Sequence, residues 1–217
     1  MPIAAEHLSG ARAVVDIGTG EGQLARLAAA GGAGSVVGLD PTWAQLAVAR
    51  TRGGGPTLVR ASAAHLPLAS ASFDAAVACL VFEHIVEVDA ALAEVGRVLR
   101  PGGRFLFFLN HPLLQSPGSG WIDDHILDPP EQYWRIGAYL VEDHSLQEVD
   151  QGILIPFIHR PLSRYVNALA RVGLVIRRLD EPAPPAGFLD RAEEYAAAAT
   201  IPRLLFILAE KEISARR

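Results

Sequence analysis

Short apolar runs alternate with helix-like segments along the first part of the chain. Ala13 to Ile17 and Ser35 to Leu39 are apolar runs of the length that predicts buried strands. Gly22 to Ala30 is rich in alanine and leucine and predicts a helix. Pro41 to Thr51 carries apolar residues at helical spacing, with proline at a natural first-turn position. The chain therefore starts with a strand–helix rhythm.

The same rhythm continues as far as residue 110. Thr57 to Ala61 and Phe73 to Leu80 predict two further strands. Asp89 is placed to cap a helix that runs to Leu99, and a Pro-Gly-Gly turn follows it. Arg104 to Leu109 predicts a fifth strand, nearly continuous in apolar residues, as buried parallel strands are. Such alternation predicts right-handed crossovers and a parallel sheet with helices on both faces.

The rhythm breaks after Asn110 and returns near residue 160. Residues 111–160 hold prolines, aromatics, histidines and acids without a repeat, which predicts an insertion with local structure of its own. A helix is predicted at Leu162 to Val172 and a strand at Leu174 to Leu179, followed by a proline-rich connection. Leu204 to Glu210 predicts a last strand, antiparallel to the one before it. A short helical segment is expected at Ala196 to Ala199.

The predicted fold class is therefore α/β: a doubly wound, mostly parallel sheet of about seven strands with an antiparallel last strand. Residues 1–217 form one domain in this interpretation, and the insertion at about 111–160 is a lid over the substrate.

Composition narrows the function classes. The net charge of −5 does not favour nucleic acid, and no apolar run approaches the ~20 residues that span a membrane. Cys79 is the single cysteine, so no internal disulfide forms. The first ten residues lack a secretory signal pattern, and a cytoplasmic location is expected. Homodimer formation is left open.

The most informative segment joins the first strand to the first helix. It reads Val14-Val15-Asp16-Ile17-Gly18-Thr19-Gly20-Glu21-Gly22. Glycines let a ligand approach the backbone, and the helix N-terminus offers unpaired N–H groups to an anion. Asp40 ends the next strand, where an acid can accept hydrogen bonds from both ribose hydroxyls of a nucleoside.

Two other interpretations of this turn remain open. A nicotinamide-dependent oxidoreductase has the pattern Gly-x-Gly-x-x-Gly, whereas here Gly22 falls one residue early and Gln23 occupies the third glycine position. The acid Asp16, two residues before the first glycine, also favours S-adenosylmethionine. Alternatively, the glycines merely make a tight turn between strand and helix.

With these motifs in place, the chain resembles the class I S-adenosylmethionine-dependent methyltransferases that act on small molecules, a Rossmann-like family. Three segments carry the resemblance, namely Val14 to Leu24, Val37 to Asp40, and Ser72 to Gly103 with its Leu-Arg-Pro-Gly-Gly turn. The resemblance covers roughly residues 12–110. It implies S-adenosylmethionine as cofactor, bound by Asp16, Gly18, Thr19, Gly20, Asp40, Pro41, Ser62, Ala63, Cys79 and Leu80.

The resemblance also implies individual roles. Asp40 would hold the ribose and Pro41 would lie beside the adenine. Ser62 replaces an acid that often bonds the adenine amino group in the family, and Ala63 retains its backbone N–H. Cys79 is interpreted as a small buried residue. Family members usually carry helices before the first strand, but only about a dozen residues precede it here.

The acceptor site is expected beyond the carboxyl ends of the strands. His111 follows strand five, and histidine suits a general base, so His111 and His159 are the catalytic candidates. Aromatic residues of the insertion, such as Trp121 and Tyr133, suit a pocket for a flat acceptor or the core of a lid. Asp123, Asp124 and His125 lack a second ligand group, so no metal is expected.

The expected reaction is methyl transfer to an oxygen, nitrogen or carbon atom of a small organic acceptor. The alternatives are a nicotinamide-dependent oxidoreductase, a non-catalytic S-adenosylmethionine-binding module, and a methyltransferase acting on protein or RNA.

Overall fold

The computed structural model describes residues 2–150, 152–183 and 200–213. In chain order the elements are α1 (Pro2–Leu8), β1 (Ala13–Ile17), α2 (Gln23–Ala30), β2 (Ser35–Asp40), α3 (Trp43–Arg52), β3 (Thr57–Arg60), β4 (Phe73–Cys79), the 3-10 helix η1 (Phe82–His84), α4 (Val88–Val98), β5 (Leu99–Asn110), β6 (Gly120–Asp124), β7 (Glu131–Arg135), β8 (Asp143–Asp150), β9 (Ile153–His159), α5 (Leu162–Arg171), β10 (Leu174–Asp180) and β11 (Leu204–Lys211).

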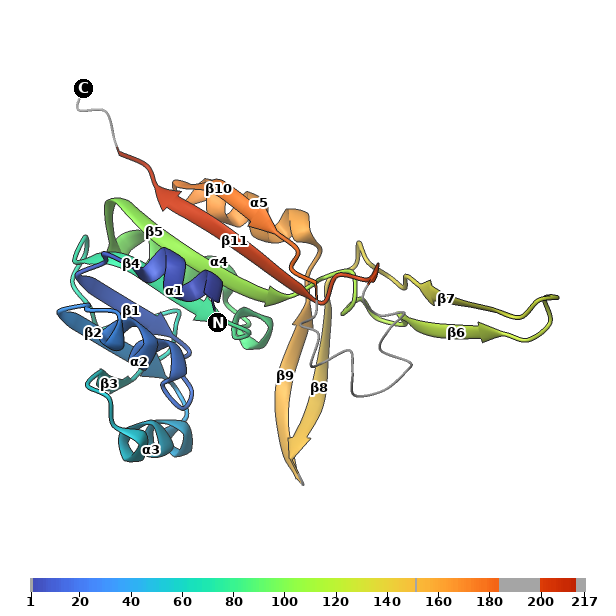
Figure 1. Ribbon diagram of the computed structural model, residues 1–217, viewed down its shortest axis with the longest axis horizontal. Coiled ribbons are helices and arrows are strands. Elements are labelled where there is room, and N and C mark those ends of the chain that lie inside the picture. The colour runs from blue at the N-terminus through green and yellow to red at the C-terminus, as the bar shows by residue number, and fades with distance from the viewer. Residues whose placement is uncertain (1, 151, 184–199, 214–217) are drawn as a thin grey trace.

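A seven-stranded sheet forms the centre of the molecule, in the order β10-β11-β5-β4-β1-β2-β3 (Figure 1). The pairs β1–β2, β1–β4, β2–β3 and β4–β5 are parallel. Strand β11 lies between β10 and β5 and is antiparallel to both. The predicted doubly wound sheet with an antiparallel last strand is confirmed.

Each face of the sheet has its own apolar core because side chains alternate along the strands. In β5, Phe105, Phe107 and Leu109 belong to the core that includes residues of α4 and α5. Leu106 and Phe108 belong to the opposite core, with residues of α1 and α2. A strand covered on both faces needs a continuous apolar run, which is why the sequence identified β5 so clearly.

Two sequence predictions differ from the structure at the ends of α4. The helix begins at Val88 after Glu87, so Asp89 is not its cap. The Asp89 carboxylate instead accepts hydrogen bonds from Arg164 and Arg171. Strand β5 begins at Leu99, before the expected turn, and Gly102 with a φ of 77° marks an irregularity in its pairing with β4.

The insertion consists of two antiparallel hairpins, β6–β7 and β8–β9. Figure 1 shows them projecting from the sheet in two directions, beyond the end of β5. Strand β9 packs against η1, and its residues Phe157 and Ile158 are buried there. The second hairpin is therefore anchored beside the loop that follows β4.

The short helix α1 precedes β1 and buries Ala4 and Leu8 against the core on the α2 side. In the described part of the chain, no helix combines the length and apolar character that a membrane crossing needs. The predicted helical segment at Ala196 to Ala199 lies outside the described residues, as does most of the proline-rich connection after Glu181.

Candidate active site

A glycine turn joins β1 to α2 at one end of the parallel strands. Gly18, Gly20 and Gly22 all have positive φ angles, of 69°, 51° and 80°. A Cβ atom on Gly18 would lie 2.1 Å from Cγ2 of Val81, so only glycine lets the turn pass this close to the loop after β4. The turn is therefore shaped both by its own backbone and by a neighbouring loop.

Asp16 stabilises this turn from the inside. Its carboxylate Oδ2 accepts hydrogen bonds from the Thr19 hydroxyl at 2.7 Å and from the Ala25 amide at 2.9 Å. Asp16 is 2% exposed, and burial raises the pKa of its carboxyl to about 6, against a smaller lowering by the two hydrogen bonds. The buried acid links the strand, the turn and the first turn of α2.

Asp40 stands at the end of β2, facing the glycine turn. Its Oδ2 accepts a hydrogen bond from the Gly20 amide at 2.9 Å, and its Oδ1 accepts one from the Thr42 amide at 2.8 Å. Each carboxylate oxygen keeps a second lone pair, so both can still accept hydrogen bonds from hydroxyl groups. The two amides fix the orientation in which the carboxylate meets a ligand.

Beside these groups lies a cleft of about 560 Å³. Eight of the ten residues predicted to bind the cofactor line it: Gly18, Gly20, Asp40, Pro41, Ser62, Ala63, Cys79 and Leu80. The other two, Asp16 and Thr19, are buried and are not among the lining residues. The structure thus brings together segments that follow four different strands.

The end of β4 supplies one wall of the cleft. Leu80 has a φ of 55°, a left-handed conformation that is costly for a residue other than glycine. Its amide donates to the Phe108 carbonyl at 3.0 Å, which holds the strained residue against β5. Cys79 is half-buried and not fully buried as expected, because it lines the cleft, and the loss of solvent around it raises the pKa of its thiol to about 12.

The cleft extends past the predicted cofactor residues into an apolar section. Val81, Ile85 and Val86 come from the loop around η1, and Ile155 and Pro156 come from β9. Two polar residues, His84 and Glu87, also line the cleft. Sequence reasoning missed His84, although its place directly after a predicted parallel strand was a usable signal.

Arg160 holds the η1 segment in place. Its guanidinium donates to three backbone carbonyls, those of Phe82 at 3.1 Å, Ile85 at 2.7 Å and Val86 at 3.2 Å. Arg160 is only 2% exposed, so its guanidinium is shielded from water. A buried cation thus fixes the loop that forms the apolar wall.

Glu83 links the same segment to the end of β5. Its Oε1 accepts hydrogen bonds from the Asn110 amide at 2.7 Å and from the Asn110 side-chain amide at 3.0 Å. Burial raises the pKa of the Glu83 carboxyl.

The two histidines predicted to be catalytic are not among the residues that line the cleft. His111 is buried, with Nε2 2.8 Å from Glu181 Oε1 and Nδ1 accepting from the Leu113 amide at 3.2 Å. His159 is also buried, and its Nε2 donates to the Tyr139 carbonyl at 2.8 Å. Both ring nitrogens of His111 are therefore occupied.

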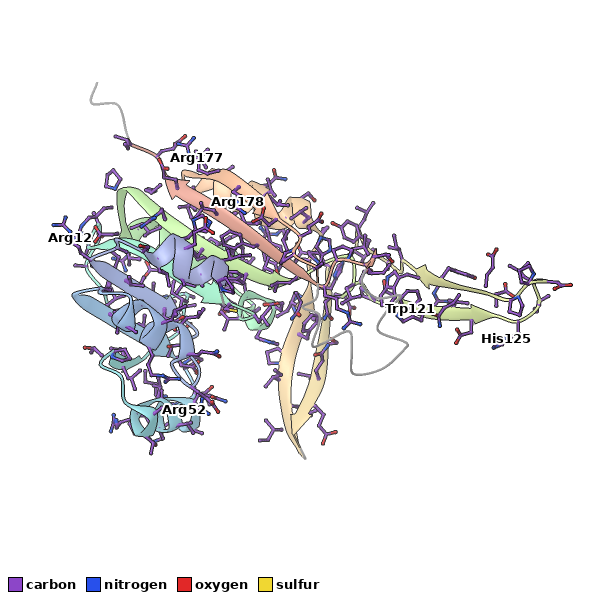
Figure 2. All side chains as sticks on the ribbon, viewed as in Figure 1. Arg12, Arg52, Trp121, His125, Arg177 and Arg178 are labelled. Atoms are coloured by element: carbon purple, nitrogen blue, oxygen red, sulfur yellow. The ribbon has the colours of Figure 1, made fainter. Side chains whose placement is uncertain are left out.

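The aromatic residues of the first hairpin lie apart from the cleft. Trp121 and Trp134 face each other across β6 and β7, with ring centroids 5.4 Å apart. Figure 2 shows Trp121 and His125 on the hairpin that projects away from the sheet. Among the described residues, no cluster of three or more histidine, cysteine, aspartate or glutamate side chains could hold a metal ion.

Comparison with known proteins agrees with this geometry. Residues 15–107 match a family model described as a methyltransferase domain. A ubiquinone/menaquinone biosynthesis C-methyltransferase UbiE of Syntrophotalea carbinolica is 38% identical over 104 residues, which cover 46% of this chain and 44% of that protein. A ubiquinone biosynthesis O-methyltransferase of Rhizobium rhizogenes is 39% identical over 106 residues, 47% of this chain and 42% of that protein. The chain thus spans less than half the length of these two relatives.

A solved structure covers the whole fold. The crystal structure of an S-adenosylmethionine-dependent methyltransferase from Mesorhizobium loti matches with a TM-score of 0.81 and 32% identity, over 97% of this chain and 96% of that one. The seven-stranded sheet, with a glycine turn after β1 and the acid Asp40 at the end of β2, defines a Rossmann-like α/β domain. The chain belongs to the S-adenosylmethionine-dependent methyltransferases.

The residues of the cleft fit S-adenosylmethionine. The glycine turn leaves no Cβ atoms at Gly18 and Gly20, and Asp40 keeps free lone pairs at the cleft. When bound, this cofactor supplies an electrophilic methyl group on a sulfonium.

Proposed function

We propose that the protein transfers a methyl group from S-adenosylmethionine to an oxygen, nitrogen or carbon atom of a small organic acceptor. The observation that carries the proposal is the continuous cleft, in which the glycine turn and Asp40 adjoin an apolar section next to the β8–β9 hairpin. Its volume of about 560 Å³ has to accommodate both cofactor and acceptor, which favours a small acceptor.

In this proposal Asp40 accepts hydrogen bonds from the ribose hydroxyls, and Pro41 lies beside the adenine with Ser62 and Ala63. Gly18 and Gly20 allow the methionine part to approach the backbone. Asp16 and Thr19 act from behind the turn, because they are buried and bonded to each other. Cys79 and Leu80 form part of the wall of the cleft and contact the cofactor through their backbone groups.

We further propose that the apolar section receives the acceptor and that part of the insertion, the β8–β9 hairpin, covers it. Ile155 and Pro156 line the cleft, which supports the assignment of residues 111–160 as a lid within one domain. The relatives named above act on carbon in one case and oxygen in the other, so the acceptor atom is left among oxygen, nitrogen and carbon.

The location and partners are proposed from composition. The net charge of −5 supports a reaction without nucleic acid, and the single cysteine fits the reducing cytoplasm. A homodimer is left open. The catalytic roles of His111 and His159 stay predictions. Both side chains are buried, and neither lines the cleft.

The cofactor assignment is tested by the variant Asp40→Ala. Loss of a charged acceptor for two ribose hydroxyls costs about 2 kcal/mol, so affinity for S-adenosylhomocysteine should fall at least about tenfold. The measurement is isothermal titration calorimetry. Glu21→Gln is the matched control, because Glu21 follows Gly20 but pairs with Arg52 and is not among the lining residues. Equal affinities for all three proteins would contradict the ribose role.

The reaction class is tested with S-adenosylmethionine carrying a labelled methyl group and a panel of phenols, hydroquinones and amines. Mass spectrometry should detect a methylated product together with S-adenosylhomocysteine. Tight binding of NADH without binding of S-adenosylhomocysteine would refute the proposal.

A further inference from the structure

Of the seven histidines, all of which the structure describes, His84 is the one that lines the cleft. It ends η1, directly after the β4 wall, and its neighbours along the cleft are the apolar residues Ile85 and Val86. His111 and His159, the catalytic candidates from the sequence, do not line the cleft. A partly exposed imidazole among apolar side chains is a suitable group for proton transfer.

The hydrogen bond of His84 decides which ring nitrogen carries the proton. Nδ1 lies 2.8 Å from the carbonyl oxygen of Pro156 on β9. A carbonyl oxygen only accepts, so Nδ1 must donate and the neutral ring keeps its lone pair on Nε2. Within the residues that the structure describes, Nε2 makes no hydrogen bond. This nitrogen is therefore available to accept a proton.

The position of the ring is fixed from both sides. The Phe157 ring contacts it edge-on, with centroids 5.9 Å apart. Arg160 holds the carbonyls of Phe82 and Ile85, on either side of His84 in the sequence. A general base is efficient only when its geometry is set before the reaction, and here the hairpin and the arginine set it.

The charged groups around His84 also belong to this arrangement. Glu83 precedes it but directs Oε1 to Asn110 of β5. Glu87 lines the same cleft, and Arg160 from the segment after β9 lies behind the loop. Within the described ranges, none of these three side chains forms a hydrogen bond with the imidazole.

From these contacts we infer that His84 is the general base of the reaction. Its Nε2 faces the acceptor, and the Pro156 carbonyl of the β8–β9 hairpin holds the imidazole in the required tautomer. The inference deepens the proposed function and rests on it, because it assumes that the acceptor occupies the apolar section of the cleft. It also gives the hairpin a chemical role beyond covering the site.

One methyl group and one proton move in this step. The acceptor's nucleophilic atom forms a bond to the methyl carbon while the carbon–sulfur bond breaks and its electron pair stays on sulfur. The acceptor's proton moves to Nε2 of His84, so the neutral imidazole becomes an imidazolium. The positive charge of the sulfonium is thereby replaced by the positive charge of the imidazolium, and solvent later removes the proton.

The tautomer is tested by nuclear magnetic resonance on the full chain labelled with 15N-histidine and saturated with S-adenosylhomocysteine. At about pH 8, where imidazole is mostly neutral, His84 should show a protonated Nδ1 and an unprotonated Nε2. The variant His84→Gln assigns the resonances by their loss. A protonated Nε2 in His84 would overturn the inference.

The direction of Nε2 is tested by replacing S-adenosylhomocysteine with S-adenosylmethionine. The added sulfonium charge and methyl group should shift the His84 ring resonances at least about threefold more than those of His7 and His125. Those two histidines are internal controls, because neither lines the cleft and neither is proposed as a base. An unchanged His84, or equal shifts of all three rings, would overturn the inference.

The two failures are distinguishable. If the wild-type protein does not bind S-adenosylhomocysteine, the proposed function fails. If it binds but His84 has the wrong tautomer or does not respond to the sulfonium, the proposed function stands and only the role of His84 fails.

Discussion

Asp16 shows how one side chain serves both the fold and the site. Its carboxylate is buried and holds the Thr19 hydroxyl and the Ala25 amide, yet burial raises its pKa to about 6. A carboxyl with a raised pKa is stable in the fold as the neutral acid, and ionising it costs free energy. Asp16 therefore shapes the glycine turn, and its ionisation lowers the free energy of unfolding as the pH rises.

The pH dependence of stability should reveal this cost. With a folded pKa of about 6 against 3.8 for the ordinary group, the stabilisation is fully present below about pH 4 and is lost as the pH rises through 6. We expect the wild type to lose about 2 kcal/mol relative to Asp16→Asn between pH 4 and 7. Urea unfolding at several pH values measures the difference. Parallel pH profiles for the two proteins would contradict the assignment.

At the scale of elements, the loop around η1 contacts parts of the chain that are distant in the sequence. Arg160 reaches three of its carbonyls, Asn110 of β5 reaches Glu83, and the Pro156 carbonyl of β9 reaches His84. The loop thus has little regular structure of its own and takes its shape from its neighbours. Since it lines the cleft, its stability and the site depend on the same contacts.

Replacing Arg160 with methionine keeps an apolar stem but removes the donors to Phe82, Ile85 and Val86. Because charged donors to buried carbonyls contribute strongly, the free energy of unfolding should fall by about 3 kcal/mol. Urea unfolding measures this free energy, and Arg160→Lys, which keeps a single charged nitrogen, should lose less stability. Arg164→Met is the control: its side chain is 24% exposed, and its surface ion pairs should cost about 1 kcal/mol or less. Equal losses for the two methionine variants would contradict this role.

At the scale of the whole molecule, an α/β body carries two hairpins with different relations to the site. The β8–β9 hairpin contributes Ile155 and Pro156 to the cleft, whereas no residue of β6–β7 is among the lining residues. Figure 1 shows β6–β7 as the element that extends furthest from the sheet. Its loop exposes Ile126, which is 95% accessible.

Deleting Gly120–Arg135 and joining the ends with two glycines tests whether the β6–β7 hairpin is separate from the cofactor site. The affinity for S-adenosylhomocysteine should stay within about threefold of wild type, because the cofactor section of the cleft is built by the body. Calorimetry measures the affinity and circular dichroism checks the fold. A folded protein that no longer binds would show that β6–β7 takes part in the cofactor site.

The sequence by itself determined the sheet and the cofactor turn. Strands such as β1 and β5 were predicted because burial on both faces demands apolar runs that are visible locally. The spacing of Gly18, Gly20 and Asp40 was informative because a strand, a turn and the next strand are close in the sequence. Asp89 shows the limit of local rules, since the helix begins one residue before it and its carboxylate pairs with Arg164, 75 positions along the chain.

Only the tertiary structure decided which histidine faces the cleft. His111 and His159 were the candidates from the sequence, but the structure buries both outside the cleft lining and places His84 within it. The contact between His84 and Pro156 joins residues 72 positions apart, across an insertion without a repeat. No local pattern encodes such a contact, because it follows from how the hairpin packs on the η1 loop.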